Sequence, residues 1–133
     1  MTRVQLKSGE LLFSENADSD YMYYVESGKI EIFVVVNSET QILDTIEERN
    51  VFGELGLLLG QKRTANARAS GPTKLVGINK AELFKRVQKD PKFATRMVRE
   101  LASKLKEANQ IIKNEIGMRR SLEISAGTRK GDS

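Results

Sequence analysis

The sequence predicts a mainly β domain, an antiparallel β-roll or jelly-roll barrel, followed by a short helix and a long helix. Two observations lead to this fold class. Up to residue 79, short β-branched and aromatic runs alternate with turn residues at close intervals, as in all-β barrels. After residue 90, apolar residues recur at helical spacing. The 133 residues, 39% of them hydrophobic, are enough for one domain with a buried core.

Six strands are expected in the first 79 residues. Turn-forming residues separate them, among them Gly9, Gly28, Gly60 and Gly71-Pro72. The strands are expected at residues 10–13, 21–26, 29–36, 40–46, 64–69 and 74–78.

The first of the two C-terminal helices is expected to begin at Asn79. Asn79 and Glu82 have the spacing of a capping box, in which each side chain accepts a hydrogen bond from the other residue's backbone N–H. Asp90 and Pro91 then supply a cap and a first-turn proline for the second helix. The apolar stripe of the first helix consists of Leu83, Phe84 and Val87.

The second helix carries a heptad seam, with apolar residues at alternating spacings of four and three. Such a seam packs either against the same helix of a second subunit, giving a homodimer, or against its own barrel, and three heptads leave both readings open. The seam residues are Ala94, Val98, Leu101, Leu105, Ala108 and Ile112.

These patterns divide the chain into a domain of residues 1–116 and a tail of residues 117–133. Within the domain, residues 1–79 form the barrel and residues 80–116 the helices. The seam stops near Gly117, and the residues that follow Ile124 are small, polar and glycine-containing. A tail of this composition is expected to be disordered.

Composition removes most enzyme chemistries. The chain has no Cys and no His, so disulfides, thiol nucleophiles, histidine bases and metal sites with these ligands are excluded. The longest aliphatic or aromatic run is residues 32–36, far shorter than the roughly 20 residues that span a bilayer. We therefore expect no catalytic residue, no metal, no cofactor and no membrane contact, and a cytoplasmic location.

Charge is distributed unevenly along the chain. Residues 1–79 hold 8 Lys or Arg and 11 Asp or Glu, a net −3, whereas residues 80–133 hold 14 and 7, a net +7. A basic C-terminal half either forms the solvated face of a helix or attracts a polyanion such as nucleic acid.

One segment, residues 52–65, differs from the strands around it. It contains Gly53, then an apolar run of helical length, and then a cation, Arg63, nine residues after the carboxylate of Glu54. Gly53 allows a close backbone approach, and the amides that follow it favour an anion. Arg63 can hold a phosphate through a bidentate fork, and Glu54 can accept hydrogen bonds from sugar hydroxyls. The segment therefore indicates a ligand that carries a phosphate beside a sugar.

This segment resembles the phosphate-binding cassette of the cyclic nucleotide-binding domains found in catabolite activator proteins, kinase regulatory subunits and nucleotide-gated channels. The pattern is Phe-Gly-Glu, an apolar and a small residue, two apolar residues, and then Arg, a hydroxyl or small residue, and Ala. Residues 52–65 fit it without an insertion. Gly9-Glu10 and Gly28-Lys29-Ile30 are similar to the family's early turns, and Asp90-Pro91 falls where its long helix begins.

The resemblance implies roles for individual residues. Glu54, helped by the Gly53 amide, would hold the ribose 2′-hydroxyl, and Arg63 would pair with the cyclic phosphate, assisted by Thr64 and Ala65. The wall of the pocket beside the base would consist of Leu43, Phe52, Leu55 and Asn109. Two alternatives stay open: Glu54 and Arg63 could form a mutual surface salt bridge, and Leu43 and Phe52 could be ordinary core residues.

Two residues depart from the family pattern. Gly56 stands where Ala is usual, and Lys62 stands where Pro is common. Two features bear on which base is bound. Thr64, which follows the cassette Arg, resembles a cGMP-preferring feature in kinase and channel relatives. At the two positions that cap adenine in catabolite activators, this chain has Ala108 and Asn109. We favour cAMP over cGMP as the ligand.

The family resemblance implies that ligand binding moves the helices after the barrel. The hinge would be a contact between Leu57 or Leu58 and Leu83 or Phe84. Too few residues follow the seam for a helix-turn-helix domain, so no DNA-binding domain is expected. We therefore predict a non-enzymatic cyclic nucleotide receptor that regulates a protein effector in trans. The alternative is a nucleic-acid-binding protein that uses the basic C-terminal half.

Overall fold

The computed structural model describes residues 1–125, with side chains through Asn114 and at Ile116. The chain divides into two compact units, Met1–Lys85 and the part from Arg86 onward. We describe each unit by itself.

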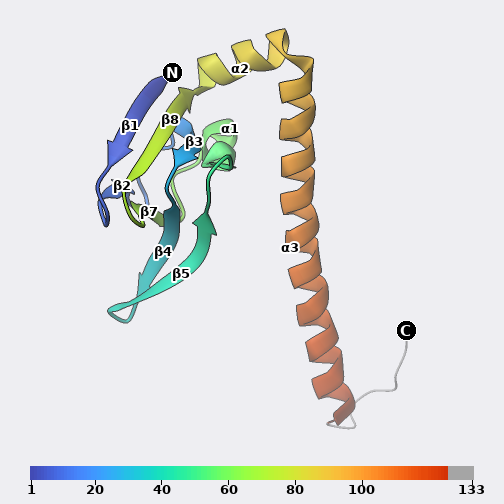
Figure 1. The fold of residues 1–133 in the computed structure, drawn as a ribbon. Helices are drawn as coiled ribbons and strands as arrows, with labels where there is room; N and C mark the ends of the chain where they lie inside the picture. The colour runs from blue at the N-terminus through green and yellow to red at the C-terminus, as the bar shows by residue number, and fades with distance from the viewer. Residues whose placement is uncertain (126–133) are drawn as a thin grey trace. The chain divides into compact units, whose positions relative to one another are not determined.

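The first unit contains two four-stranded antiparallel sheets (Figure 1). One has the strand order β1-β8-β3-β6 and the other β2-β7-β4-β5, so each sheet combines strands that are distant in the sequence. The strands are β1 (Thr2–Leu6), β2 (Leu11–Phe13), β3 (Tyr21–Ser27), β4 (Ile30–Val36), β5 (Glu39–Ile46), β6 (Val51–Phe52), β7 (Asn66–Ala69) and β8 (Thr73–Asn79).

The hydrophobic core draws residues from strands of both sheets. In β7 and β8, buried residues alternate with more exposed ones, because successive side chains of a strand point to opposite faces. This arrangement confirms the predicted mainly β barrel. The core cluster consists of Leu6, Val25, Ile30, Phe52, Ala67, Ala69 and Leu75.

Three helices complete the described chain: α1 (Glu54–Leu59), α2 (Lys80–Lys89) and α3 (Pro91–Ser125). The capping box before α2 is confirmed, because the Asn79 N–H donates to Glu82 Oε1 at 3.1 Å and the Glu82 N–H donates to Asn79 Oδ1 at 2.9 Å. The cap before α3 is confirmed as well, since the Phe93 N–H donates to Asp90 Oδ1 at 3.1 Å.

The structure corrects three features of the sequence prediction. Strands β1 and β6 were not expected, although Val4 and Leu6 in β1 already show period-two spacing. The strand expected at residues 64–69 begins only at Asn66. The helix expected to end at residue 116 continues through Gly117 to Ser125, so disorder is wrong for residues 117–125. The rest of the predicted tail, residues 126–133, lies outside the described residues.

Among the described residues, no helix combines the length and the apolar character that crossing a membrane requires.

Candidate functional site

The candidate site is the segment Gly53–Ala65, called the cassette below, which connects β6 to β7 through α1. Gly53 precedes the helix with φ at 80°, in the left-handed region that favours glycine. A Cβ at this position would lie 2.6 Å from Nη1 of Arg63, so the close approach of that side chain also requires glycine. The helix ends at Gly60, again with positive φ, and the Gly60 N–H donates to the Gly56 carbonyl. The glycines therefore shape the cassette around Arg63.

The Arg63 side chain is buried, with 7% of its surface exposed. Nη1 donates to the Gly53 carbonyl at 3.0 Å, and Nη2 donates to the Tyr21 carbonyl. The guanidinium carbon lies 4.2 Å from the centre of the Phe13 ring. Nε is buried without a hydrogen-bond partner among the described residues. Burial lowers the pKa of Arg63, while the nearby Tyr23 and Asp20 act in the opposite direction.

Glu54, the first residue of α1, is even less accessible, with 1% of its surface exposed. It follows Gly53, whose carbonyl receives the Arg63 hydrogen bond. Because both side chains are buried, a surface salt bridge does not describe them. The cassette thus holds an acidic and a basic side chain that are both largely removed from solvent.

The loop between β2 and β3, residues 14–20, fixes the backbone of the cassette. The Asn16 N–H donates to the Arg63 carbonyl, and the Arg63 N–H donates to the Ala17 carbonyl, both at 2.8 Å. A Cβ at Gly56 would lie 2.4 Å from Ser19 Oγ, so this loop packs closely against α1 as well. Arg63 is therefore held by main-chain bonds as well as by its guanidinium.

An aromatic cluster lies beside Arg63. The Tyr23 and Phe52 rings stack with centroids 5.4 Å apart, and the Phe13 ring lies 6.3 Å from Tyr23 and 6.4 Å from Phe52. Burial raises the pKa of Tyr23, and the Coulombic effect of Arg63 opposes this shift. Sequence analysis missed Phe13, Tyr21 and Tyr23 as site residues. The alternating tyrosines of β3 were the available signal, since period two places Tyr21 and Tyr23 on one face.

The structure places the predicted wall residues in different environments. Phe52 belongs to the core, with 4% of its surface exposed, as the alternative reading expected. Leu43 in β5 is 59% exposed, and Leu55 on α1 is 48% exposed. Asn109 is exposed on α3, in the second compact unit. A shared role of these four residues at the base stays a prediction.

The remaining predicted residues fall into two groups. Next to Arg63, Thr64 is exposed and Ala65 is buried. Among the hinge residues, Leu57 and Leu83 are buried, Leu58 is half-buried, and Phe84 is exposed with Nζ of Lys80 5.8 Å from its ring centre. The hinge contact itself stays a prediction. Within the described residues, no group of three or more acidic side chains is arranged to hold a metal ion.

Comparison with known proteins identifies the family. The model of the cyclic nucleotide-binding domain matches residues 3–90, which include the whole cassette and both sheets apart from the start of β1. The chain therefore belongs to the cyclic nucleotide-binding domain family, as the cassette pattern had predicted.

Individual relatives agree with this assignment. The chain is 30% identical over 92 residues to the cAMP-dependent protein kinase regulatory subunit of Dictyostelium discoideum, covering 68% of this chain and 28% of the relative. It is similar to the catabolite activator protein of Thermus thermophilus, with 25% identity, a TM-score of 0.77, and coverage of 84% of this chain and 53% of that one.

A third relative is the EAL enzyme Bd1971. Its cAMP-bound form matches with 27% identity, a TM-score of 0.61, and coverage of 92% of this chain and 33% of that one. Its cGMP-bound form matches at 26% identity and a TM-score of 0.63, with coverage of 91% and 32%. The chain spans about a quarter of the length of the curated relatives it matches.

Proposed function

We propose that the domain is a receptor that binds cAMP in preference to cGMP and passes the signal to a protein effector through its C-terminal helices. The observation that carries the proposal is the pair of buried side chains Glu54 and Arg63 in one short cassette of a cyclic nucleotide-binding domain.

Arg63 is the proposed phosphate-binding residue. Two of its N–H groups already donate to the carbonyls of Gly53 and Tyr21, which hold the guanidinium in a defined orientation. The buried Nε–H is a further donor, and a donor without a partner costs about 1–3 kcal/mol. A phosphate oxygen would satisfy it in a charge-assisted bond. Thr64 and Ala65 are proposed to donate to the same phosphate.

Glu54 is the proposed ribose-binding residue, together with the Gly53 amide. A carboxylate has only acceptor sites at neutral pH, so it suits a hydroxyl and repels a phosphate. The two roles are therefore divided between the beginning and the end of the cassette. Leu43, Phe52, Leu55 and Asn109 are the proposed wall around the base.

Selectivity for cAMP is assigned to the α3 residues proposed to lie beside the base. Asn109 offers both a donor and an acceptor to a purine, while Ala108 offers no side-chain hydrogen bond. The enzyme Bd1971 is known in both cAMP-bound and cGMP-bound forms, so its likeness to this chain does not favour either base. Parallel titrations with the two nucleotides decide the preference.

Signal transmission is assigned to the hinge residues and α3. Along α3, Val98, Leu105 and Ile112 form an exposed apolar row, with exposed fractions of 66%, 64% and 53%. Such a row at heptad spacing supports a homodimer through this helix. The proposal places the receptor in the cytoplasm and assigns it no catalytic residue.

Isothermal titration with cAMP and cGMP tests the proposal. We expect micromolar or tighter binding of cAMP, lost in Arg63→Ala and strongly weakened in Glu54→Gln. The matched controls are Arg3→Ala and Glu26→Ala, which remove an exposed arginine–carboxylate pair on β1 and β3. Thermal unfolding of each variant verifies its fold. Absence of heat for both nucleotides with the folded wild type, or unchanged affinity in both cassette variants, contradicts the proposal.

A further inference from the structure

Helix α3 carries a row of cations at regular spacing. Lys92, Arg99, Lys106 and Lys113 follow one another at intervals of seven residues, and Arg96 lies one turn from Lys92. Seven residues are two turns, so the row repeats at about 10.5 Å along one side of the helix. All five side chains are exposed. We call this surface the basic face.

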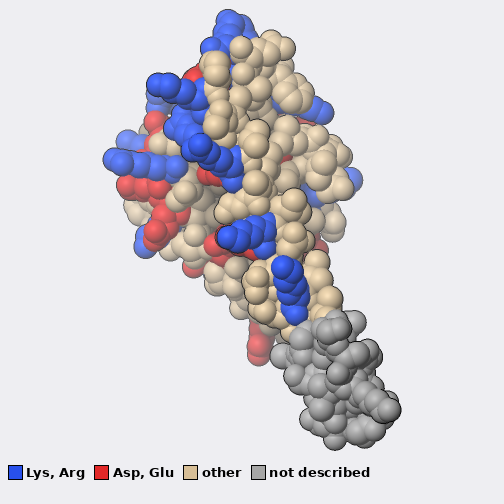
Figure 2. All heavy atoms as spheres, turned by 90° about the vertical axis from the view of Figure 1, so that its right-hand side faces the viewer, with Lys and Arg blue, Asp and Glu red and all other residues tan. Residues whose placement is uncertain are grey.

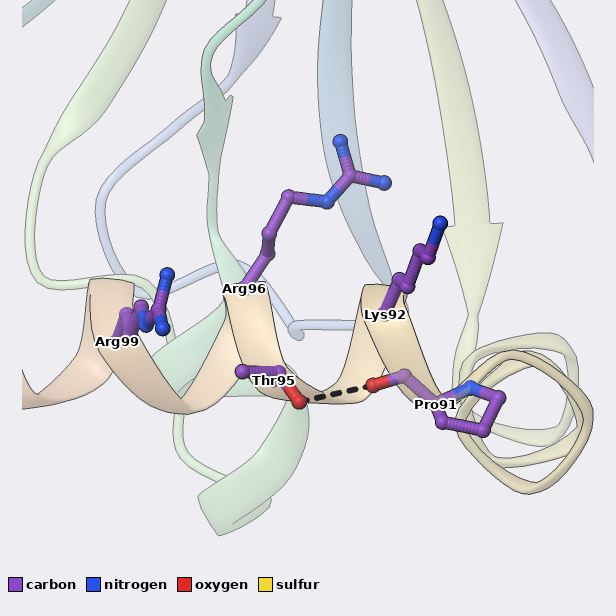
Figure 3. A pocket seen from close by; sticks show the side chains of 5 residues that line it. All are labelled: Pro91, Lys92, Thr95, Arg96 and Arg99. Atoms are coloured by element: carbon purple, nitrogen blue, oxygen red, sulfur yellow. Dashed lines mark hydrogen bonds between the residues drawn. The ribbon is translucent and has the colours of Figure 1, made fainter.

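The N-terminal part of the basic face borders a surface pocket. Lys92, Arg96 and Arg99 line it together with Pro91 and Thr95, and its volume is about 600 Å³. Figure 3 shows the three cationic side chains extending to the same side of the helix. The Thr95 hydroxyl donates a hydrogen bond to the Pro91 carbonyl at 2.9 Å. The polar lining of the pocket is therefore dominated by positive charge.

The cations of the basic face make few ionic contacts with the described residues. Lys92, Arg99, Lys106 and Lys113 form no salt bridge within the described part of the chain. Arg96 interacts electrostatically with Glu100, where it opposes the rise in the pKa of that carboxyl that partial burial causes. Figure 2, turned by 90° from Figure 1, shows Lys and Arg side chains in blue at intervals along this helix.

The basic face is separate from the apolar row on the same helix. With Val98, Leu105 and Ile112 at heptad position a, the cations at 92, 99, 106 and 113 occupy position b, and Arg96 occupies position f. Positions b and f point away from the a and d seam of a coiled coil. Pairing of two α3 helices through the apolar row would leave the basic face open to a different partner.

We propose that the basic face of α3 docks an acidic helix of a partner protein. A helix with carboxylates at seven-residue intervals has the same repeat of about 10.5 Å, so the opposite charges match along its length. Duplex DNA carries a charge about every 1.7 Å, and five cations spread over six turns neutralise few of them.

Docking on the basic face does not require a bound cyclic nucleotide, and only its regulation would rest on the proposed function. The test uses the full chain and a fluorescein-labelled helical peptide of about four heptads with Glu at positions b and f. The same peptide with Gln at those positions is the control probe. A short DNA duplex and vesicles of phosphatidylserine and phosphatidylcholine are titrated in parallel.

The variant is Lys92→Glu/Arg99→Glu, and its matched control is Lys7→Glu/Lys74→Glu, which reverses two exposed charges on the first unit. Each pair changes four charge units and takes the formal net charge from +4 to 0. We expect saturable binding of the Glu peptide, weaker by about tenfold or more in the α3 variant and little changed in the control.

Three results overturn the docking proposal. They are equal affinity for the Glu and Gln peptides, equal loss in the two double variants, and tighter binding of DNA or vesicles through Lys92 and Arg99. Titration with cAMP on the same samples separates this proposal from the proposed function. Peptide binding without nucleotide binding contradicts only the latter, and nucleotide binding without peptide binding contradicts only the former.

Discussion

In the cassette, the two charged residues assigned to the ligand are buried, whereas along α3 the cations of the basic face are exposed. Arg63 donates to two backbone carbonyls and lies over an aromatic ring, so its position is set by the fold. Lys106 and Lys113 have no such neighbours to position them among the described residues. Buried charges suit a small ligand of fixed shape, and exposed charges suit an extended partner and salt-sensitive association.

The largest expected effect distinguishes a buried residue of the proposed wall from an exposed one. Phe52→Ala should lower the free energy of unfolding by about 3–5 kcal/mol, because it empties a packed aromatic position in the core. Leu43→Ala should change it by about 0.5 kcal/mol or less, since that side chain is mostly exposed. Urea unfolding measures both. Similar losses in the two variants would contradict the assignment of Phe52 to the core and Leu43 to the surface.

A smaller effect is expected at the contact between the cassette and the β2–β3 loop. Gly56→Ala adds a methyl group 2.4 Å from Ser19 Oγ and 2.9 Å from Ser19 Cβ. Overpacking destabilises a fold by about 1–3 kcal/mol, whereas the higher helix propensity of Ala compared with Gly stabilises it by only about 1 kcal/mol. The substitution should therefore destabilise the domain, although Ala is usual at this position in the family.

Removing the Ser19 side chain should turn the effect of Gly56→Ala on the free energy of unfolding from destabilising to stabilising. In a Ser19→Gly background, Gly56→Ala should stabilise the domain, and the double-mutant cycle measured by urea unfolding should give a coupling energy of about 1 kcal/mol or more. Additive single effects would mean that the loop does not constrain α1.

The capping box of α2 predicts a pH dependence. A hydrogen bond from the N-terminal ammonium, followed by one from the Asn79 N–H, holds the pKa of Glu82 below its ordinary value of 4.5. Because the folded pKa is depressed, the ionised carboxylate stabilises the fold above pH 4.5, and this contribution is lost as the pH falls through the folded pKa. Glu82→Gln should flatten the dependence of thermal stability on pH in this acidic range. A profile identical to that of the wild type contradicts this role for Glu82.

The smallest effect on fold stability is expected on the heptad seam of α3, which includes Leu101 and the apolar row. Leu101→Lys/Leu105→Lys should leave the β barrel folded by circular dichroism and convert a dimer to a monomer in light scattering, because the lysines place like charges in the seam. An unchanged dimer, or a wild type that is monomeric at high concentration, removes the proposed role of the row.

Sequence patterns predicted the parts of the fold that side chains specify directly. The capping box, the Asp90 cap and most strands follow from residue type and spacing, and the cassette was found because its glycines and charges have a fixed order. The main-chain partners of Arg63, at Gly53, Ala17 and Tyr21, were not foreseen, since a backbone carbonyl leaves no residue-type signature. The continuation of α3 past Gly117 was missed because a single glycine costs only about 1 kcal/mol in a helix.

The most direct test of the receptor assignment is the proton and nitrogen resonance of the Arg63 Nε–H group, followed by NMR as cAMP is added. Comparison with the spectrum of Arg63→Lys assigns the signal. Because this buried donor has no partner among the described residues, the account predicts a large downfield proton shift as a phosphate oxygen accepts its hydrogen bond. A signal that stays in place while cAMP saturates the domain would contradict the central role of Arg63.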